Sequence, residues 1–291
     1  MKAYWDSRKT LIEQALQAEL DKTGILDEKL RESMAYSLMA GGKRMRPILL
    51  MAAADAVGAD GKRFLSVACA LEMIHTYSLI HDDLPAMDND DYRRGRLTNH
   101  KVYGDGIAIL AGDALLTLAF SVILRQKDVP SERLLRVVDE ISRAAGAEGM
   151  VGGQVLDLRA ENQNISIQDL RKIHMGKTGA LFRAALRSGA ILGSASAQQL
   201  DALTLYAEHF GLAFQITDDI LDVVGNTAMI GKPVGSDEKN HKSTYVTLTS
   251  LDQARELAQS AAAEAVGALR SFGDEASFLR QLVIHLVARE Q

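Results

Sequence analysis

The chain has 291 residues, of which 47% are hydrophobic and 24% are charged, and its formal net charge is −5. This composition is typical of a soluble globular protein, and the acidic balance argues against a nucleic-acid-binding surface, which is normally basic. The single cysteine, Cys69, excludes an internal disulfide and a zinc–thiolate cluster. Because the first residues also lack the apolar core of a signal peptide, we expect a cytoplasmic location.

Helical periodicity runs through the chain from its first residues. Only four prolines and 5% aromatic residues occur, and apolar residues recur with the i, i+3, i+4 spacing of amphipathic helices. Glycines loosen the segment 146–153, and Gly176 with Gly179 predicts a kink in a longer helix. Strand patterns, repeats and linkers are not evident, so we predict one all-α domain over residues 1–291. The expected helices cover residues 7–20, 27–39, 48–57, 63–81, 107–125, 131–144, 168–187, 197–222, 251–270 and 275–289.

The most apolar stretch, residues 107–124, is nearly long enough to cross a membrane. Asp113 lies within it, and a carboxylate inside a bilayer is costly without a partner. We therefore interpret the stretch as a buried core helix and expect no membrane span.

The densest charge in the sequence follows the helix expected over 63–81. Five aspartates fall between positions 82 and 91, and three arginines follow by position 96. Hard carboxylate oxygens suit Mg²⁺, and arginine forks suit phosphate oxygens. The block therefore indicates a site for a magnesium-bound phosphorylated ligand, although a solvated acidic turn between two helices has the same composition.

The spacing within this block predicts a break in the helix. Asp82 and Asp88 are six residues apart, which a regular helix would leave about 120° apart. Pro85 cannot continue the helical hydrogen bonds. We therefore expect the chain to curl back so that Asp88 reaches a metal shared with Asp82. His75, seven residues before Asp82, points toward the same place.

A second acidic group ends the helix expected over 197–222. Asp218 and Asp222 are offset by about 40° and share a face, with Gln215 one turn earlier. Two like charges one turn apart repel each other, so a cation is expected between them. The two acidic groups are predicted to face each other across a helical bundle, as in other metal sites of this kind.

These residues resemble the short-chain trans-isoprenyl diphosphate synthases, most closely the bacterial farnesyl diphosphate synthases. The resemblance extends from about Gly41 to Tyr245, and it implies the isoprenoid synthase fold, a bundle of roughly ten or more helices around a deep central cavity. It rests on the following matches: the stretch Gly41–Pro47, the aspartate motif at 82–88, Arg93–Gly95, Gly153 and Gln154 with Asp157, Gly176–Thr178, the aspartate motif at 218–222, Gly231 with Lys232, and Asp237 with Lys242–Tyr245.

The resemblance also implies a role for each matching residue. Asp82, Asp88 and Asp218 would bind Mg²⁺, three ions per active site, with Asp83 and Asp222 in support. Thr178 and Gln215 would turn oxygens toward the allylic carbon. The groups implied to hold the allylic diphosphate are Arg93, Lys177, Lys232 and Lys242, and those implied to hold isopentenyl diphosphate are Lys43, Arg46, His75 and Arg94.

The implied reaction is a condensation of isopentenyl diphosphate with dimethylallyl and then geranyl diphosphate, by ionisation, condensation and proton elimination. Fixed cations and Mg²⁺ stabilise the departing diphosphate, and an apolar, dry pocket protects the carbocation. A homodimer is implied as well. The set implied to carry the chemistry is Asp82, Asp83, Asp88, Arg93, Lys177, Thr178, Gln215, Asp218 and Lys232.

The resemblance also bears on product length. In this family a large residue five places before the first aspartate limits growth, and here Tyr77, followed by Ser78, holds that place. Together with Pro85 and Ala86 in the first motif, this predicts a C15 product. Geranylgeranyl and geranyl diphosphate remain alternative products, and Tyr77 as an ordinary core aromatic residue remains an alternative interpretation.

Other function classes explain less of the sequence. A metal phosphohydrolase built on His81 and Asp82 would need further histidines, whereas the second acidic group offers only carboxylates. A terpenoid cyclase would not need a second diphosphate site, and a non-catalytic subunit would be expected to have lost part of the motifs. The pattern departs from the family at Val246, Ser250 and the short C-terminus.

Overall fold

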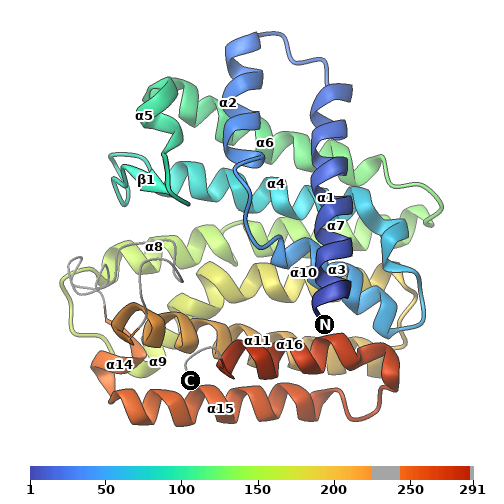
Figure 1. The fold of residues 1–291 in the computed structure, drawn as a ribbon, viewed down its shortest axis with the longest axis vertical. Coiled ribbons are helices and arrows are strands. Elements are labelled where there is room, and N and C mark those ends of the chain that lie inside the picture. Colours follow the sequence, from blue (N-terminus) through green and yellow to red (C-terminus); the bar gives the residue numbers. More distant parts are fainter. Residues whose placement is uncertain (225–242, 289–291) are drawn as a thin grey trace.

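The computed structural model describes residues 1–224 and 243–288, and within them the chain is almost wholly helical (Figure 1). The all-α fold predicted from the sequence is confirmed. The first half contains α1 (Lys2–Lys22), α2 (Glu28–Leu38), α3 (Met45–Ala56), η1 (Gly61–Phe64), α4 (Leu65–Asp82), β1 (Tyr92–Arg93), β2 (Arg96–Leu97), α5 (Asn99–Tyr103), α6 (Asp105–Leu124) and α7 (Ser131–Ala145). The second half contains α8 (Met150–Ala160), α9 (Ile167–His174), η2 (Met175–Gly179), α10 (Ala180–Leu192), α11 (Ala197–Val224), α14 (Tyr245–Leu248), α15 (Leu251–Ala268), η3 (Asp274–Ala276) and α16 (Ser277–Val287).

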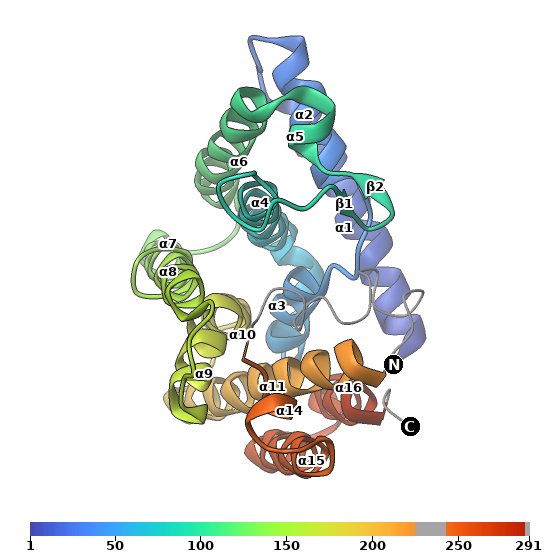
Figure 2. The ribbon, with the colours of Figure 1, turned by 90° about the vertical axis from the view of Figure 1, so that its left-hand side faces the viewer.

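The long helices stack around α3, α4 and α10, which lie in the middle of the molecule. In Figure 2, α4, α6, α7 and α8 are seen nearly end-on. α4 and α6 lie in the upper part of the view, and α11, α15 and α16 lie at the bottom. α4 packs on α6 and α3, α10 packs on α3 and α7, and α11 packs on α15. One hydrophobic core joins these helices and extends from Ile12 to Leu286.

α4 is central because its middle turns are apolar on every face apart from Glu72. All residues from Val67 to Ile74 are buried, so this helix has no side that favours water. By length and hydropathy alone, Gly61–Asp82 and Asp105–Leu124 would each suffice to cross a membrane, with 67% and 44% of their windows buried. A core helix of a globular protein passes the same test, and the burial of α4 fits that explanation.

The turn before α3 is held by a buried ion pair. Arg44 adopts a left-handed backbone (φ 52°) and its side chain is fully enclosed. Its guanidinium donates to Glu72 Oε1 at 2.7 Å and to the Leu38 carbonyl oxygen at 2.8 Å. Gly42 (φ 123°) leaves room for the Arg94 guanidinium, which a Cβ atom would meet at 2.7 Å. The turn is therefore tied to α4 on one side and to the β1–β2 hairpin on the other.

The structure differs from the predicted elements where glycine is involved. Residues 150–160 form a regular helix, α8, although the glycines at 146–153 suggested a loosened segment. The reason is close packing, because a Cβ atom on Gly153 would lie 2.1 Å from the Lys177 backbone nitrogen. The kink predicted near Gly176 is a π-helical turn, η2, between α9 and α10. α5 and the short hairpin were also not predicted.

Candidate active site

A cavity of about 550 Å³ opens between the two halves of the bundle. Its walls come from the turn before α3, from α4 and the hairpin, and from α8, α9, η2, α10, α11 and the residues before α14. Among the predicted site residues, those that line this cavity are Lys43, Arg46, His75, Asp82, Asp88, Arg93, Arg94, Lys177, Thr178, Gln215 and Asp218. Lys232 and Lys242 lie outside the described residues.

The first aspartate motif curls back at the end of α4. The Asp88 backbone N–H donates to the Asp82 carbonyl oxygen at 2.9 Å, and Asn89 turns the chain with φ 50°. Both aspartates therefore line the cavity although they are six residues apart. Burial is the main cause that raises the pKa of Asp82 to about 6, and the charge of Asp88 adds to it, whereas Lys177 opposes it.

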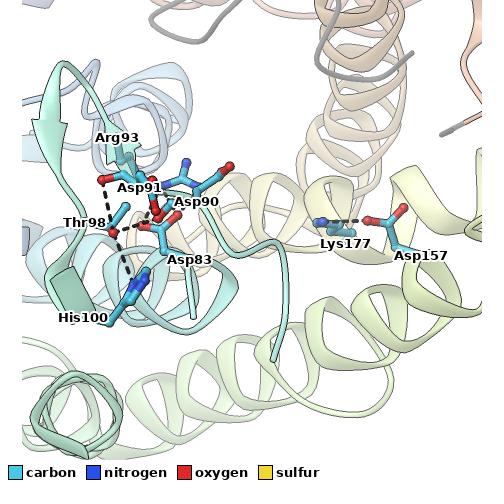
Figure 3. A network of polar contacts seen from close by, with 8 residues as sticks. All are labelled: Asp83, Asp90, Asp91, Arg93, Thr98, His100, Asp157 and Lys177. Carbon is cyan, nitrogen blue, oxygen red and sulfur yellow. Dashed lines mark hydrogen bonds and ion pairs between the residues drawn. The ribbon is translucent and has the colours of Figure 1, made fainter. Parts of the chain in front are cut away.

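Asp83 plays a different structural part from Asp82 and Asp88. It is buried, and among the residues described around the cavity it is not part of the lining. Arg93 donates from Nε to both of its oxygens, at 2.7 and 2.9 Å (Figure 3). Burial disfavours the charged form of Arg93 and lowers its pKa. The hydrogen bonds and the negative charge of Asp83 outweigh this effect, so the pKa of Arg93 is raised. Asp83 thus fixes Arg93 in the cavity wall.

The hairpin that carries Arg93 and Arg94 is closed by Thr98. Its hydroxyl donates to the Asp90 carbonyl oxygen at 2.7 Å, and its backbone N–H donates to the Asp91 carbonyl oxygen at 3.0 Å. Figure 3 shows Thr98 and His100 beneath the Asp83–Arg93 pair. Arg94 (φ 53°) donates in turn to the Gly41 carbonyl oxygen. The two arginines consequently face different parts of the same cavity wall.

The part of the wall that contains Arg46, His75 and Arg94 is strongly basic. The Arg46 guanidinium lies 4.7 Å from the centre of the Phe182 ring, and its buried Nε has no hydrogen-bond partner. Burial lowers the pKa of Arg46 to about 10, although Glu72 counteracts this. Burial and then Arg46 and Arg94 hold the pKa of His75 well below its usual value, so the imidazole is neutral at physiological pH. A buried donor without a partner beside other cations suits an anionic ligand.

Lys177 is presented by the π-helical turn η2. Its ammonium donates to Asp157 Oδ2 of α8 at 2.7 Å, and both residues line the cavity (Figure 3). Thr178, the next residue, lines the cavity as well. His174, at the end of α9, is a third member of this wall, and burial lowers its pKa to about 4. The face of α8 that carries Gly153 and Asp157 therefore locates both the backbone and the ammonium of Lys177.

The second aspartate motif divides its residues between the cavity and the protein interior. Asp218 is exposed in the cavity wall with Gln215 one turn before it. Asp222 is buried and, within the part of the chain that is described, does not line the cavity. Asp219, which the sequence did not single out, lines the cavity and accepts a hydrogen bond from the Tyr245 backbone N–H at 2.7 Å.

The carboxylates fit a hard divalent cation by their chemistry. Asp82, Asp88 and Asp218 offer oxygen ligands from two sides of one cavity, and Mg²⁺ commonly uses one or two carboxylates with water and substrate phosphate. Within residues 1–224 and 243–288, three or more carboxylate, imidazole or thiol groups do not converge into a ready-made metal cage. The arrangement is thus one that a metal–phosphate complex would complete.

Tyr77 and Ser78 lie a little more than one turn before the end of α4. Tyr77 is 6% exposed, and its ring meets the His81 ring edge-on at 5.7 Å. His81 in turn contacts the Ile109 carbonyl oxygen at 3.0 Å, in space that Gly112 leaves open. Neither Tyr77 nor Ser78 is among the described residues that line the cavity. Tyr77 is therefore a buried residue outside the described lining, packed against His81 of the same helix.

Several residues of the site were missed or left without a role by the sequence pattern. Glu72 faces Arg44, Arg46 and Arg94 from α4, but a glutamate inside an apolar run gives no signal of its partners. His174 precedes the Gly176–Lys177 motif, and the sequence alone gave it no role. The adjacent pair Asp218–Asp219 carried a signal that was missed. Two neighbouring aspartates on a helix point in different directions, so the second one is expected to have a different partner from the first.

Comparison with known proteins agrees with this geometry. The polyprenyl synthetase family model matches residues 27–281. The dimethylallyltranstransferase of Fischerella ambigua (strain UTEX 1903) is 50% identical over 288 residues, 98% of this chain and 83% of that protein. The farnesyl diphosphate synthase of Geobacillus stearothermophilus is 54% identical over 230 residues, 78% of this chain and 77% of that protein. The apo crystal structure of an FPP/GFPP synthase from Zymomonas mobilis superposes with a TM-score of 0.88 at 37% identity, covering 98% of both chains.

The fold and the cavity together define an all-α prenyltransferase. The chain belongs to the polyprenyl synthetase family. The family resemblance predicted from the sequence motifs is therefore confirmed.

Proposed function

We propose that this protein condenses isopentenyl diphosphate with dimethylallyl diphosphate and then geranyl diphosphate to make farnesyl diphosphate. The observation that carries the proposal is one cavity that joins carboxylates from two motifs to two separate groups of cations. The carboxylates suit a metal-bound diphosphate, and the second group of cations suits a second diphosphate. The farnesyl diphosphate synthase of Geobacillus stearothermophilus, at 54% identity, supports the same function.

Membership of the family implies a dependence on a divalent metal. We propose that Asp82, Asp88 and Asp218 hold Mg²⁺, with three ions in each site, and that buried Asp222 supports Asp218 from the same helix. When bound, the metal supplies Lewis-acid stabilisation of the diphosphate that leaves the allylic carbon. The raised pKa of Asp82 in the metal-free chain is consistent with a carboxylate that needs a nearby cation to stay ionised at low pH.

The cations divide between the two substrates. Arg93 and Lys177 both act electrostatically on Asp82 of the first motif, and we propose that they hold the allylic diphosphate, together with Lys232 and Lys242 from outside the described residues. Lys177 would exchange Asp157 for diphosphate oxygens as the substrate enters. The groups proposed to hold isopentenyl diphosphate are Lys43, Arg46, His75 and Arg94, from the basic part of the wall. Neutral His75 would donate one hydrogen bond without adding charge.

The neutral part of the wall suits the carbocation. Thr178 and Gln215 offer oxygen dipoles, and Phe214 offers an aromatic ring beside Gln215. Oxygen dipoles and aromatic rings stabilise positive charge without forming a covalent bond to it. The carbon–carbon bond forms when the isopentenyl double bond attacks the cation, and loss of a proton to the released diphosphate completes the product.

Product length is the finer part of the proposal. A C15 product is proposed because the buried Tyr77 ring packs against the His81 ring, and His81 in turn reaches the Ile109 carbonyl oxygen of α6. A prenyl product longer than C15 would require the packing of these two rings to open. The names of the relatives differ in product, so geranyl and geranylgeranyl diphosphate remain the alternatives to be separated by experiment.

The test is incubation of the purified protein with Mg²⁺, isopentenyl diphosphate and either dimethylallyl or geranyl diphosphate, with products separated by chain length. Farnesyl diphosphate is the expected main product from both primers. Asp82→Ala and Asp218→Ala should each lower turnover by a factor of about 10² or more, because each removes charge stabilisation from the departing diphosphate. Release of inorganic phosphate without elongation would contradict the proposal.

A further inference from the structure

Asp219, the second aspartate of the Asp218–Asp219 pair, makes a hydrogen bond to the protein backbone at the edge of the cavity. We propose that Asp219 is a positioning residue that fixes the segment Ser243–Tyr245 through the Tyr245 backbone N–H. This inference rests on the proposed function, because the wall that it fixes belongs to the same site. It assigns to Asp219 a task different from that of Asp218.

The contact itself is short and buried. Asp219 is 5% exposed, and its Oδ2 accepts the Tyr245 N–H at 2.7 Å, across 26 residues of sequence. Asp218, one residue earlier, is exposed in the cavity wall. One helical residue corresponds to a rotation of about 100°, so the two carboxylates cannot both face the same point. Both residues border the cavity, but Asp218 is exposed in its wall whereas the Asp219 carboxylate is buried and accepts from the start of α14.

The Tyr245 N–H has no other way to be satisfied within the helix. Tyr245 is the first residue of α14, and the first N–H groups of a helix have no intrahelical partner. A capping box already uses the Thr244 side chain for the Thr247 N–H and the Thr247 hydroxyl for the Thr244 N–H. The box leaves the N–H groups of Tyr245 and Val246, and Asp219 accepts the first of them. A charged acceptor makes such a hydrogen bond stronger than a neutral one.

Two parts of the wall depend on this position. Ser243 and Thr244 line the cavity directly. Tyr245 is 3% exposed, packs with Ile216 and Ile220 of α11, and places its ring 5.7 Å from that of His174. His174 immediately precedes η2, the turn that carries Lys177. A shift of Tyr245 would thus be felt both at Ser243–Thr244 and at the start of the lysine turn.

The experiment removes the donor and the acceptor separately. Tyr245→Pro lacks the N–H, and Tyr245→Ala is its matched control, because both lose the ring and only one loses the donor. Proline is well tolerated at the first position of a helix, and Thr244 already has the extended backbone that proline requires before it (ψ 166°). Asp219→Ala is then combined with each of them in a double-mutant cycle.

In the Tyr245→Ala background, Asp219→Ala should lower kcat/KM by about tenfold, the effect of losing one charge-assisted hydrogen bond. In the Tyr245→Pro background the same substitution should cause almost no further loss. An equal loss in both backgrounds would overturn the proposal, because Asp219 would then act through something other than the Tyr245 N–H.

A second comparison separates positioning from metal binding. Asp219→Asn keeps an oxygen acceptor, so it should retain most of the activity that Asp219→Ala loses and leave the half-saturating Mg²⁺ concentration unchanged. Asp218→Asn should raise that concentration. If Asp219→Asn raised it to the same extent, Asp219 would be a metal ligand and the proposal would be wrong.

Hydrogen exchange provides a readout that does not need activity. Peptides covering residues 243–249 should exchange about tenfold faster in Asp219→Ala than in the unsubstituted protein, and near the original rate in Asp219→Asn. Unchanged exchange in Asp219→Ala would refute the positioning role even if the variant were inactive. An unsubstituted protein without prenyl transfer would refute the proposed function and leave this exchange measurement as an independent test.

Discussion

Two buried histidines make the stability of the protein depend on pH. His75 and His174 have pKa values lowered by burial, well below the usual value for His75 and to about 4 for His174. Below pH 6.5 the unfolded chain takes up protons that the folded chain does not, so the free energy of unfolding decreases as pH falls toward 4. Asp82, with its pKa raised to about 6, has the opposite sign and offsets part of this loss.

We expect the free energy of unfolding, measured with urea in metal-free buffer, to be about 2 kcal/mol lower at pH 5 than at pH 7.5. His174→Gln should reduce that difference by about half or more, because the variant has one fewer group that gains a proton on unfolding. A variant with the same pH dependence as the unsubstituted protein would contradict the neutral, buried state of His174.

Tyr77 links the proposed product length to one side chain. Tyr77→Ala should lengthen the product beyond C15, because it removes the buried ring that packs against His81. It should also lower the free energy of unfolding by about 3 kcal/mol, as other deletions of a buried ring do. Tyr77→Phe keeps the ring and should keep the C15 product. A Tyr77→Ala enzyme whose products still end at C15 would remove Tyr77 from the control of length.

At this scale the sequence predicted residue types well and partners poorly. Eleven of the predicted site residues line one cavity, since charge blocks at helix ends must meet where the bundle opens. The contacts that orient them come from residues distant in sequence. Glu72 for Arg44, Asp157 for Lys177 and the Tyr245 N–H for Asp219 depend on packing that no local pattern encodes.

The contact of α8 with η2 sets the lysine turn. Gly153→Ala should lower kcat/KM by about tenfold or more and reduce the free energy of unfolding, because the new Cβ atom would meet the Lys177 backbone nitrogen at 2.1 Å. Gly106→Ala in α6 is the matched control, since its Cβ atom meets nothing within 4 Å and alanine favours a helix. The result is checked by steady-state kinetics and thermal unfolding of both variants, and equal behaviour would contradict the role of this contact.

Most helices were predictable because their apolar periodicity is strong, and their ends differ from the prediction by a few residues. α8 was not, because its glycines resemble a loop in sequence but act in packing against η2. The π-helical turn was predicted only as a kink, since two glycines show where a helix departs from regularity and not how. The short hairpin has too few residues to show alternation.

At the scale of the whole molecule, we propose a homodimer. Exposed apolar side chains occur on α6, where Leu110 is 54% exposed, and on α8, where Val155 is 50% exposed. Figure 2 shows α6 and α8 on the same side of the molecule. Apolar residues gathered on one side are typical of a surface that another subunit covers.

Leu110→Glu should convert the dimer to a monomer of 31.6 kDa in light scattering after size exclusion, because it places a charge in the proposed interface. Leu257→Glu is the control, at a residue that is 39% exposed on α15, the helix at the opposite end of the bundle from α6 (Figure 1). A Leu110→Glu protein that remained dimeric would place the interface elsewhere.

The order of the cavity residues along the chain has a consequence for synthesis. The described lining begins at Ala40 and ends at Thr244, and the larger hydrophobic core continues to Leu286. At about 5–20 residues per second, the ribosome adds Asp218 roughly 7 to 26 seconds after Asp88. During that interval the first aspartates and the arginines beside them lack the wall that later encloses them. The nascent protein therefore carries half of its charged site in water, and the two halves can meet only when most of the chain has left the ribosome.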